Sequence, residues 1–368
     1  MTLTILDKYI IKQFIRNFLF SLLCFILVFI LVDLFENLDR FIDNKFNFIR
    51  IANYYYYFTP EIIKLVTPVS MLLATLFTAG RMINFNELVA VKNAGVSLLR
   101  FMMPFFIVGA LVTGLSIYFN NWIVPEANKK KFFIERNFLG KNIITVGLTR
   151  LYFQDSKNQL ILIEQFKEVE SSAKKVSILV YKPDNLTELV KRIDIEELKW
   201  ENGRWKIING IERTLNAESE NLTNYSQIYA DEVKGINKIN LKPTDITKKQ
   251  LKPDELNYGE LKEFINSQVK GGQNVARAQV DFYSKISFPF SSLIVIIFGI
   301  SISTGTKKRR SLAIQFGISM LTSFIYLGFV KFSHTFGYNG DLNPLITAWL
   351  ANIIFATYGG VNLYIKNY

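Results

Sequence analysis

The feature that most constrains this chain is a set of six long runs that contain no charged residue. They cover residues 17–32, 65–80, 101–125, 286–306, 311–330 and 342–365. A helix needs roughly 20 mostly apolar residues to cross the ~30 Å hydrocarbon core of a membrane. Apolar neighbours lengthen the shortest runs, for example Phe14 and Ile15 before the first. The pattern therefore predicts an α-helical membrane protein with six spanning helices.

The six runs form two groups of three, and the segment between them has a different composition. Residues 126–280 contain 26 Lys and Arg and 22 Asp and Glu, which is typical of a soluble domain. Its short segments rich in Ile, Val and aromatic residues predict β-strands. Asn202-Gly203 is a strong hairpin signal, because both residues tolerate the positive φ that a two-residue turn requires. We expect an extracytoplasmic β-sandwich or jelly-roll-like domain.

Changes of composition and of period divide the chain into four parts. The segment DELNYGELKEFINSQVK carries a helical stripe of Leu, Phe and Ile, which predicts an amphipathic helix at the membrane surface. The expected parts are residues 1–125 with the first three spans, 126–253 as the β-domain, 254–280 as interfacial helix and linker, and 281–368 with the last three spans.

The charge of the short connections predicts the orientation of the chain. If the N-terminus is cytoplasmic, eleven Lys and Arg face two acids in the cytoplasmic segments, which leaves +9. The short connections on the other side, residues 33–50 and 331–343, carry −1 and 0. Because cytoplasmic loops are enriched in Lys and Arg, we expect both termini in the cytoplasm and the β-domain outside it. The net charge of +12 is then a topology signal rather than a sign of nucleic-acid binding.

The residues that most catalytic and metal sites require are nearly missing. The chain has one cysteine, Cys24, and one histidine, His334, which excludes a disulfide framework, a multi-His metal site and a conventional nucleophile–His pair. The segment GISISTGTK has the wrong glycine spacing for a phosphate-binding loop. We therefore expect no catalytic residue and no cofactor, and any energy-driven work needs a partner protein or an ion gradient.

Two charged residues stand close to the second apolar run. Glu61 and Lys64 are separated by three positions, so they share one face of a helix. Two interpretations stay open: a self-neutralising pair near the membrane surface, or part of a cavity that takes a charged amphiphile. A proton relay would need acids near the middle of several spans, and the sequence has none there.

The segment NELVAVKNAGVSLLR lies between the second and third apolar runs. Asn84 is expected as the N-cap of a short helix with Glu87 at N3, the arrangement of a capping box. Gly95 is expected just after the last helical residue, where positive φ is common. The prediction is a cytoplasmic helix within residues 84–95, and Glu87 either only caps it or belongs to a docking surface for another protein.

The same segment carries a resemblance to a known family. RMINFNELVAVKNAGVSLLR resembles the E-[LI]-x-x-[ML]-x-x-x-G segment of the LptF/LptG (YjgP/YjgQ) lipopolysaccharide-export permeases. ILDKYIIKQF is similar to the N-terminal segment of the LptG type. NWIVPEANKK, WENGRWKIINGIE and DFYSKISFPFSSL also resemble segments of that family, in the same order along nearly the whole chain.

The resemblance implies a non-catalytic subunit of an ABC-type exporter that extracts lipopolysaccharide from a Gram-negative inner membrane. A separate cytoplasmic ATPase, LptB, binds the ATP and docks on the short helix. A second permease subunit of the LptF or LptG type pairs with this chain, and the β-jelly roll passes the lipid to LptC and a periplasmic bridge. The docking residues that the resemblance implies are Asn84, Glu87, Leu88, Val91 and Gly95.

The resemblance also implies a lipid cavity between spans one, two and five of both permease subunits. LptG-type members commonly carry lysines around the outer end of span one. Here that neighbourhood holds the acids Asp33, Glu36 and Asp39, and Arg40 is its only basic residue. Lys130, Lys131 and Arg136 are therefore expected to supply contacts to lipid phosphates. The candidate cavity residues are Arg40, Glu61, Lys64, Lys130, Lys131, Arg136 and Lys331.

Two functions of other classes remain as alternatives. A membrane-held binding or sensor protein would use the β-domain, but six spans and a cytoplasmic helix exceed what such a protein needs. A secondary transporter would be expected to show inverted repeats and acids near the middle of the membrane. The sequence shows neither feature.

Overall fold

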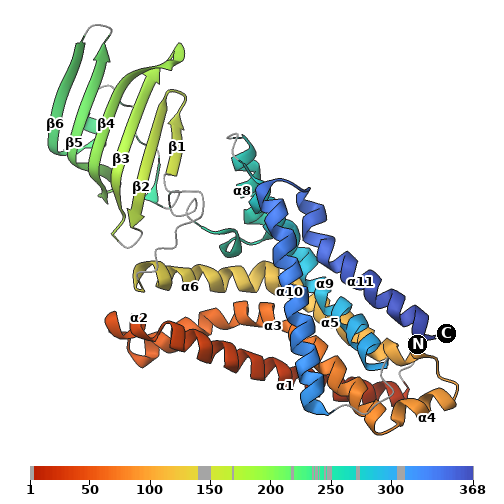
Figure 1. Ribbon diagram of the computed structural model, residues 1–368. Coiled ribbons are helices and arrows are strands. Elements are labelled where there is room, and N and C mark those ends of the chain that lie inside the picture. The colour runs from red at the N-terminus through yellow and green to blue at the C-terminus, as the bar shows by residue number, and fades with distance from the viewer. Residues whose placement is uncertain are drawn as a thin grey trace. The chain divides into compact units, whose positions relative to one another are not determined.

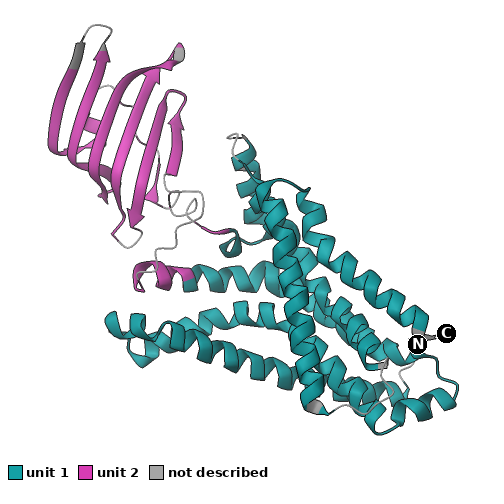
Figure 2. Ribbon diagram, viewed as in Figure 1, with its two compact units in different colours: residues 1–131, 253–368 teal, residues 132–252 magenta. Residues whose placement is uncertain are grey.

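The computed structural model describes most of the chain as two compact units. The described residues are 4–139, 151–167, 170–216, 219–233, 236, 239, 241–243, 246, 251–270, 274–304 and 311–367. Figure 2 shows the division: residues 1–131 with 253–368 form the first unit, and residues 132–252 form the second. The first boundary falls later than the expected residue 126, because the third span continues into the following helix without a break.

Long helices build the first unit (Figure 1). The long helices are α1 (Ile5–Glu36), α3 (Phe48–Asn84), α5 (Leu98–Tyr118), α9 (Ala276–Thr304), α10 (Leu312–Asn339) and α11 (Pro344–Asn367). Shorter helices are α2 (Leu38–Asp43), α4 (Glu87–Asn93), α8 (Tyr258–Lys270), the π-helix η1 (Phe119–Ile123) and the 3-10 helix η3 (Pro253–Glu255). α6 (Val124–Asn137) begins in the first unit and ends in the second. Within the described residues, six helices are long and apolar enough to cross a membrane, and the third combines α5, η1 and α6. The six predicted spans are confirmed.

The core of the first unit forms around α3. Its middle, residues 66–80, is mostly buried, and Leu72 and Leu76 lie in one apolar cluster with Phe14 of α1, Phe105 of α5 and Ile296 of α9. Close approach of α9 depends on a small residue, since a Cβ at Gly299 would lie 2.9 Å from the Thr75 side chain. Packing of this kind, rather than water exclusion, drives helix association in lipid.

Other spans leave large apolar side chains uncovered. Phe20 and Leu23 of α1 are 62% and 59% exposed, and Leu321 and Phe324 of α10 are 64% and 71% exposed. Contiguous apolar surface of this extent is unusual on a soluble monomer and marks a membrane or protein interface. These faces are therefore suited to contact with lipid or with another membrane chain.

The second unit contains a six-stranded antiparallel sheet in sequential order, β1 to β6. The strands are β1 (Leu151–Ser156), β2 (Gln159–Lys167), β3 (Ser172–Lys182), β4 (Asn185–Glu201), β5 (Arg204–Asn216) and β6 (Ser219–Tyr229), followed by the short helix η2 (Ala230–Glu232). The predicted inserted β-domain is confirmed. In the described residues its strands form one meandering sheet.

One face of this sheet carries the core of the second unit. Ile161, Ile178 and Ile193 are neighbours on adjacent strands and are fully buried. Described residues after η2 cover this face, and the Trp205 indole donates a hydrogen bond of 2.7 Å to the Leu241 carbonyl. The alternation of buried and exposed positions along β2 and β3 follows from the two-residue period of a strand.

The β4–β5 hairpin turns at the predicted residues. Asn202 and Gly203 have φ of 53° and 77°, as a type I′ turn requires. The flanking Trp200 and Trp205 are paired across the strands, with ring centroids 5.0 Å apart. The Asn-Gly prediction is confirmed.

We predict that the same substitution destabilises the protein at one glycine but not at another. Gly203→Ala places a Cβ on a left-handed residue and should lower the free energy of unfolding by about 1–2 kcal/mol. Gly259→Ala, within α8 and without a close clash, should be neutral or stabilising by about 0.5–1 kcal/mol. Thermal unfolding of the purified full-length protein, followed by tryptophan fluorescence, checks both. Equal midpoints for the two variants would contradict the turn assignment.

Candidate functional site

The candidate site begins with the short helix α4, which follows α3 almost directly. α3 continues to Asn84, so this residue is the last of α3 and not the N-cap of the next helix. Asn86 takes the N-cap position with φ of 57° and makes no side-chain capping bond, and Glu87 is the first helical residue. The predicted capping box is therefore wrong, because the long apolar helix before it extends further than its charge pattern indicated.

The end of α4 agrees with the prediction. Gly95 has φ of 79°. Its amide donates to the Lys92 carbonyl at 2.9 Å, and the Val96 amide donates to the Val91 carbonyl at 3.2 Å. This pair of bonds is a Schellman motif, which ends a helix sharply at a left-handed glycine.

The burial of α4 separates a supporting face from an exposed face. Leu88 is 6% exposed and packs into the apolar core of the first unit, so it supports the helix from behind and does not lie on its exposed face. Val89 is 53% exposed, and Ala90 and Lys92 are also exposed. Phe85, just before the helix, is 67% exposed.

The first turns of α1 brace this region. The Tyr9 hydroxyl donates to the Glu87 carboxylate, at 3.2 Å to the nearer oxygen. The Thr4 and Asp7 side chains form a capping box at the start of α1. The Arg100 guanidinium pairs with the Asp7 carboxylate at 2.6 Å, which ties the start of α5 to the start of α1. α4 is therefore tied to α1 through Tyr9, while the Asp7–Arg100 pair joins its neighbours α1 and α5 to each other.

A second polar group, the junction cluster, lies where the first unit ends at Lys131 and resumes at Pro253. It consists of Glu61, Lys64, Asn128, Lys129, Lys131, Asp254 and Glu260. Glu61 pairs with Lys131, whose side chain is 6% exposed, and Lys64 pairs with Asp254 at 3.5 Å. Glu61 and Lys64 thus have partners on other elements, and the first of the two interpretations, a self-neutralising pair, is wrong, because α6 and η3 bring Lys131 and Asp254 within reach of α3.

The junction cluster also joins α6 to the chain that returns after the sheet. The Asn128 side-chain amide donates to the Asp254 carbonyl at 3.2 Å, and Lys129 pairs with Glu260 at 3.0 Å. Glu260 closes a capping box with Asn257 at the start of α8. The Lys64 ammonium beside Asp254 holds the pKa of that carboxyl below its usual range.

The remaining candidate cavity residues do not all join this cluster. Lys130 is exposed, and its ammonium lies 5.1 Å from the centroid of the Tyr57 ring. Arg40 on α2 and Lys331 on α10 are exposed. Arg136 lies on the last turn of α6, within the second unit. Asp254 and Glu260 were not predicted from the sequence. The one sequence feature that could have pointed to them is their position at the start of the predicted interfacial helix.

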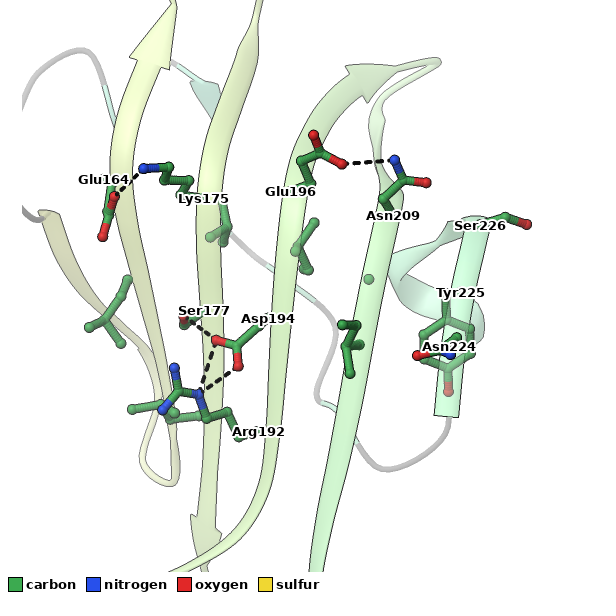
Figure 3. A pocket seen from close by; sticks show the side chains of 16 residues that line it. Glu164, Lys175, Ser177, Arg192, Asp194, Glu196, Asn209, Asn224, Tyr225 and Ser226 are labelled. Carbon is green, nitrogen blue, oxygen red and sulfur yellow. Dashed lines mark hydrogen bonds and ion pairs between the residues drawn. The ribbon is translucent and has the colours of Figure 1, made fainter. Parts of the chain in front are cut away.

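The sheet has a hollow of about 870 Å³ on the face opposite the apolar core (Figure 3). Its charged side chains pair with one another: Lys175 with Glu164 at 3.6 Å, and Arg192 with Asp194 at 2.9 Å. Burial opposes ionisation of Asp194, but hydrogen bonds from Arg192 and Ser177 outweigh it and lower the pKa of this carboxyl.

Two residues in one row of this hollow have a left-handed backbone, although the strand register is the same on both sides of the row. Lys175 in β3 and Asn209 in β5 have φ of 51° and 52°, and they stand on either side of Glu196 in β4. The Asn209 side-chain amide donates to the Glu196 carboxylate at 2.8 Å. Non-glycine residues in this conformation store backbone strain, which here accompanies a local distortion of the sheet.

Metal-ligating groups do not gather anywhere in the part of the chain that the structure describes. Among those residues, no group of three or more His, Cys, Asp or Glu side chains could hold a metal ion. His334 lies beside Ser284, 3.2 Å from ring nitrogen to hydroxyl, within the helical unit.

We predict that the Asp7–Arg100 pair contributes to the stability of the α4 region. Arg100→Gln leaves the Asp7 carboxylate, 4% exposed, without its cation and should cost about 2–3 kcal/mol of unfolding free energy. The double variant Asp7→Asn with Arg100→Gln should cost less, since no buried charge is then unpaired. Thermal unfolding in detergent measures both, with Lys12→Gln on exposed α1 surface as the control. An Arg100→Gln midpoint equal to that of Lys12→Gln would contradict this.

Comparison with known proteins identifies the family. The model of the lipopolysaccharide export system permease family LptF/LptG matches residues 8–365. Lipopolysaccharide export system permease protein LptG of Escherichia coli K12 is 22% identical over 276 residues, which are 74% of this chain and 72% of that protein. LptG of Escherichia coli O6:H1 matches to the same extent. With six predicted spans and a sheet inserted between the third and fourth, this chain belongs to the LptF/LptG family of lipopolysaccharide export permeases.

Proposed function

We propose that this chain is the transmembrane permease subunit of an exporter that extracts lipopolysaccharide from the bacterial inner membrane. The observation that carries the proposal is the family match over residues 8–365. The chain supplies the membrane path and no catalytic residue, and a separate ATPase binds and hydrolyses the ATP. The ATPase binds one conformation of the permease more tightly in one nucleotide state than in the other, and this difference in binding free energy drives the conformational change.

The exposed face of α4 is the proposed docking surface for the ATPase. It presents Phe85, Val89 and Lys92, with Glu87 at its edge. A mixed surface of a few apolar side chains with charges around them suits a protein interface. The Schellman motif and the buried Leu88 hold this surface rigidly against the helical unit.

A second permease subunit of the LptF or LptG type is the proposed neighbour in the membrane. The uncovered apolar faces of α1 and α10 support this, because two such faces can enclose a lipid between two subunits. Exposed Lys331 on α10 and Lys130 on α6 are then available to phosphate groups of the lipid. An LptC-type protein is proposed to receive the lipid from the sheet domain.

The charge distribution supports the proposed orientation. The short segments assigned to the cytoplasm carry +9, against −1 and 0 for the short connections on the other side. This asymmetry favours both termini in the cytoplasm and the inserted sheet in the periplasm. The ends of α3 would then lie on opposite sides of the inner membrane.

Co-purification of the full chain from its own membranes tests this function. We expect a cytoplasmic ATPase and a second six-span permease in the purified complex, identified by mass spectrometry. Recovery of the chain alone, or as a homodimer without any nucleotide-binding protein, would contradict the exporter assignment. It would favour instead a membrane-held binding protein or a secondary transporter.

We predict that Val89→Asp and Glu87→Lys each reduce ATPase recovery at least about tenfold, because Val89→Asp puts a charge into an apolar contact and Glu87→Lys reverses one, and the few central side chains of an interface can contribute about 2 kcal/mol or more. Tyr9→Phe removes the hydrogen bond to Glu87 but keeps its charge, so ATPase recovery should be nearly unchanged. Leu222→Asp, at an exposed strand position, is the matched control for Val89→Asp. Normal recovery and export with Glu87→Lys would reject α4 as the docking surface.

A further inference from the structure

The chain passes from one unit to the other twice, after Lys131 and before Pro253, and we call these two points the crossings. Residues on a single turn of α3 bind the chain beside both crossings. Glu61 binds Lys131, where the first unit ends, and Lys64 binds Asp254, directly after the chain returns. We propose that Glu61 and Lys64 are positioning residues that fix both crossings to α3, so that a displacement of α3 reaches the inserted unit at its two ends together.

The spacing of the two residues supports one shared point of attachment. Residues three apart on a helix are neighbours on its surface, with Cβ atoms about 5–6 Å apart. Glu61 and Lys64 therefore bring the two crossings close together, although these are far apart in the sequence. Opposite charges at the two positions also make the attachments specific, since each position rejects the partner of the other.

The two crossings are further tied to each other. The Asn128 amide donates to the Asp254 carbonyl, and Lys129 pairs with Glu260 at the start of α8. The Lys131 ammonium also lies 4.6 Å from the centroid of the Phe58 ring on α3. α3, α6 and the returning chain thus form one connected polar cluster at this end of the helical unit.

The two attachments differ in strength. The Glu61–Lys131 pair is largely buried, with 21% and 6% of the side chains exposed. Water and salt screen a buried pair of this kind less than an exposed one, so it holds more firmly. The Lys64–Asp254 pair is more open, with 21% and 56% exposed, so salt screens it and it breaks more easily. The first crossing is therefore held more firmly than the second.

α3 connects this attachment point to α4. From Lys64 to Asn84 the helix covers about 30 Å at 1.5 Å per residue, and then Phe85 and Asn86 lead into α4. Pro68 removes one backbone hydrogen bond, but Val66, Ser70 and their neighbours are buried, so packing supports the helix there. We infer that a movement of α4 displaces α3, and this step rests on the proposed docking of an ATPase on α4.

Hydrogen–deuterium exchange of the purified full chain tests the attachment itself. Lys64→Gln should raise exchange about tenfold in peptides covering 253–260, and Glu61→Gln should do so in peptides covering 124–131. Lys64→Arg should restore slow exchange, because it keeps the charge. Glu61→Gln with Lys131→Gln should raise exchange in the 124–131 peptides by about as much as Glu61→Gln alone, because both variants remove the same ion pair.

Lys262→Gln is the matched control, since Lys262 is exposed on α8 within the same region. A general loss of stability would raise exchange throughout the chain rather than in these peptides. Unchanged exchange at both crossings in Lys64→Gln and Glu61→Gln, or an equal rise with Lys262→Gln, would overturn the proposal.

The same experiment on the complex with its ATPase tests transmission. In the wild type, nucleotide should change exchange at both crossings, and the Glu61→Gln with Lys64→Gln variant should lose this response while ATPase recovery stays normal. A response that persists in that variant would reject transmission through the two residues. Absence of any ATPase from the complex would contradict the proposed function, whereas the exchange measured without nucleotide still decides the attachment.

Discussion

The packing of α3 is the constraint on which the described helical unit depends. Inside a membrane, a helix satisfies its own backbone hydrogen bonds, so its position is decided by side-chain contacts with other helices. α3 and α9 together provide most of these contacts, because α1 and α9 pack on α3 while α5 and α11 pack on α9. α1 and α10 are instead uncovered over much of their length. A central buried helix with exposed neighbours suits a subunit that completes its surface with lipid and another chain.

The charged and hydrogen-bonding side chains of the helical unit gather towards its two ends. Glu87 with Tyr9 and Asp7 with Arg100 lie at one end, and the junction cluster lies towards the other. Between them, the buried polar groups on α3 are hydroxyls, of which Thr67 and Thr75 donate to carbonyls one turn earlier and Thr78 accepts from Asn17 of α1. Hydroxyls with a backbone partner are tolerated in an apolar interior, whereas isolated charges are not. This arrangement leaves α3 free of ionised groups between its two functional ends.

Local patterns predicted local structure well. The charge-free runs located all six spans, Asn202-Gly203 located the hairpin, and Gly95 located the end of α4. Each depends on residues adjacent in sequence, through the length of an apolar run or the φ that a residue tolerates. The start of α4 was predicted less well. Asn84 has the side chain of a helix cap, yet packing of Met82 and Leu76 in the core carries α3 through it.

The sequence by itself determined that this chain is a membrane protein with three spans, an inserted β-domain and three more spans, because hydrophobicity and turn geometry act locally. The sequence also indicated the family, because several segments resemble those of LptF/LptG permeases and occur in the same order. Only the tertiary structure decided the partners of the charged residues. Glu61 and Lys64 are close enough in sequence to pair, but Lys131 and Asp254 reach them instead. Ion pairs form between groups that folding brings within a few ångströms, and sequence separation does not reveal that distance.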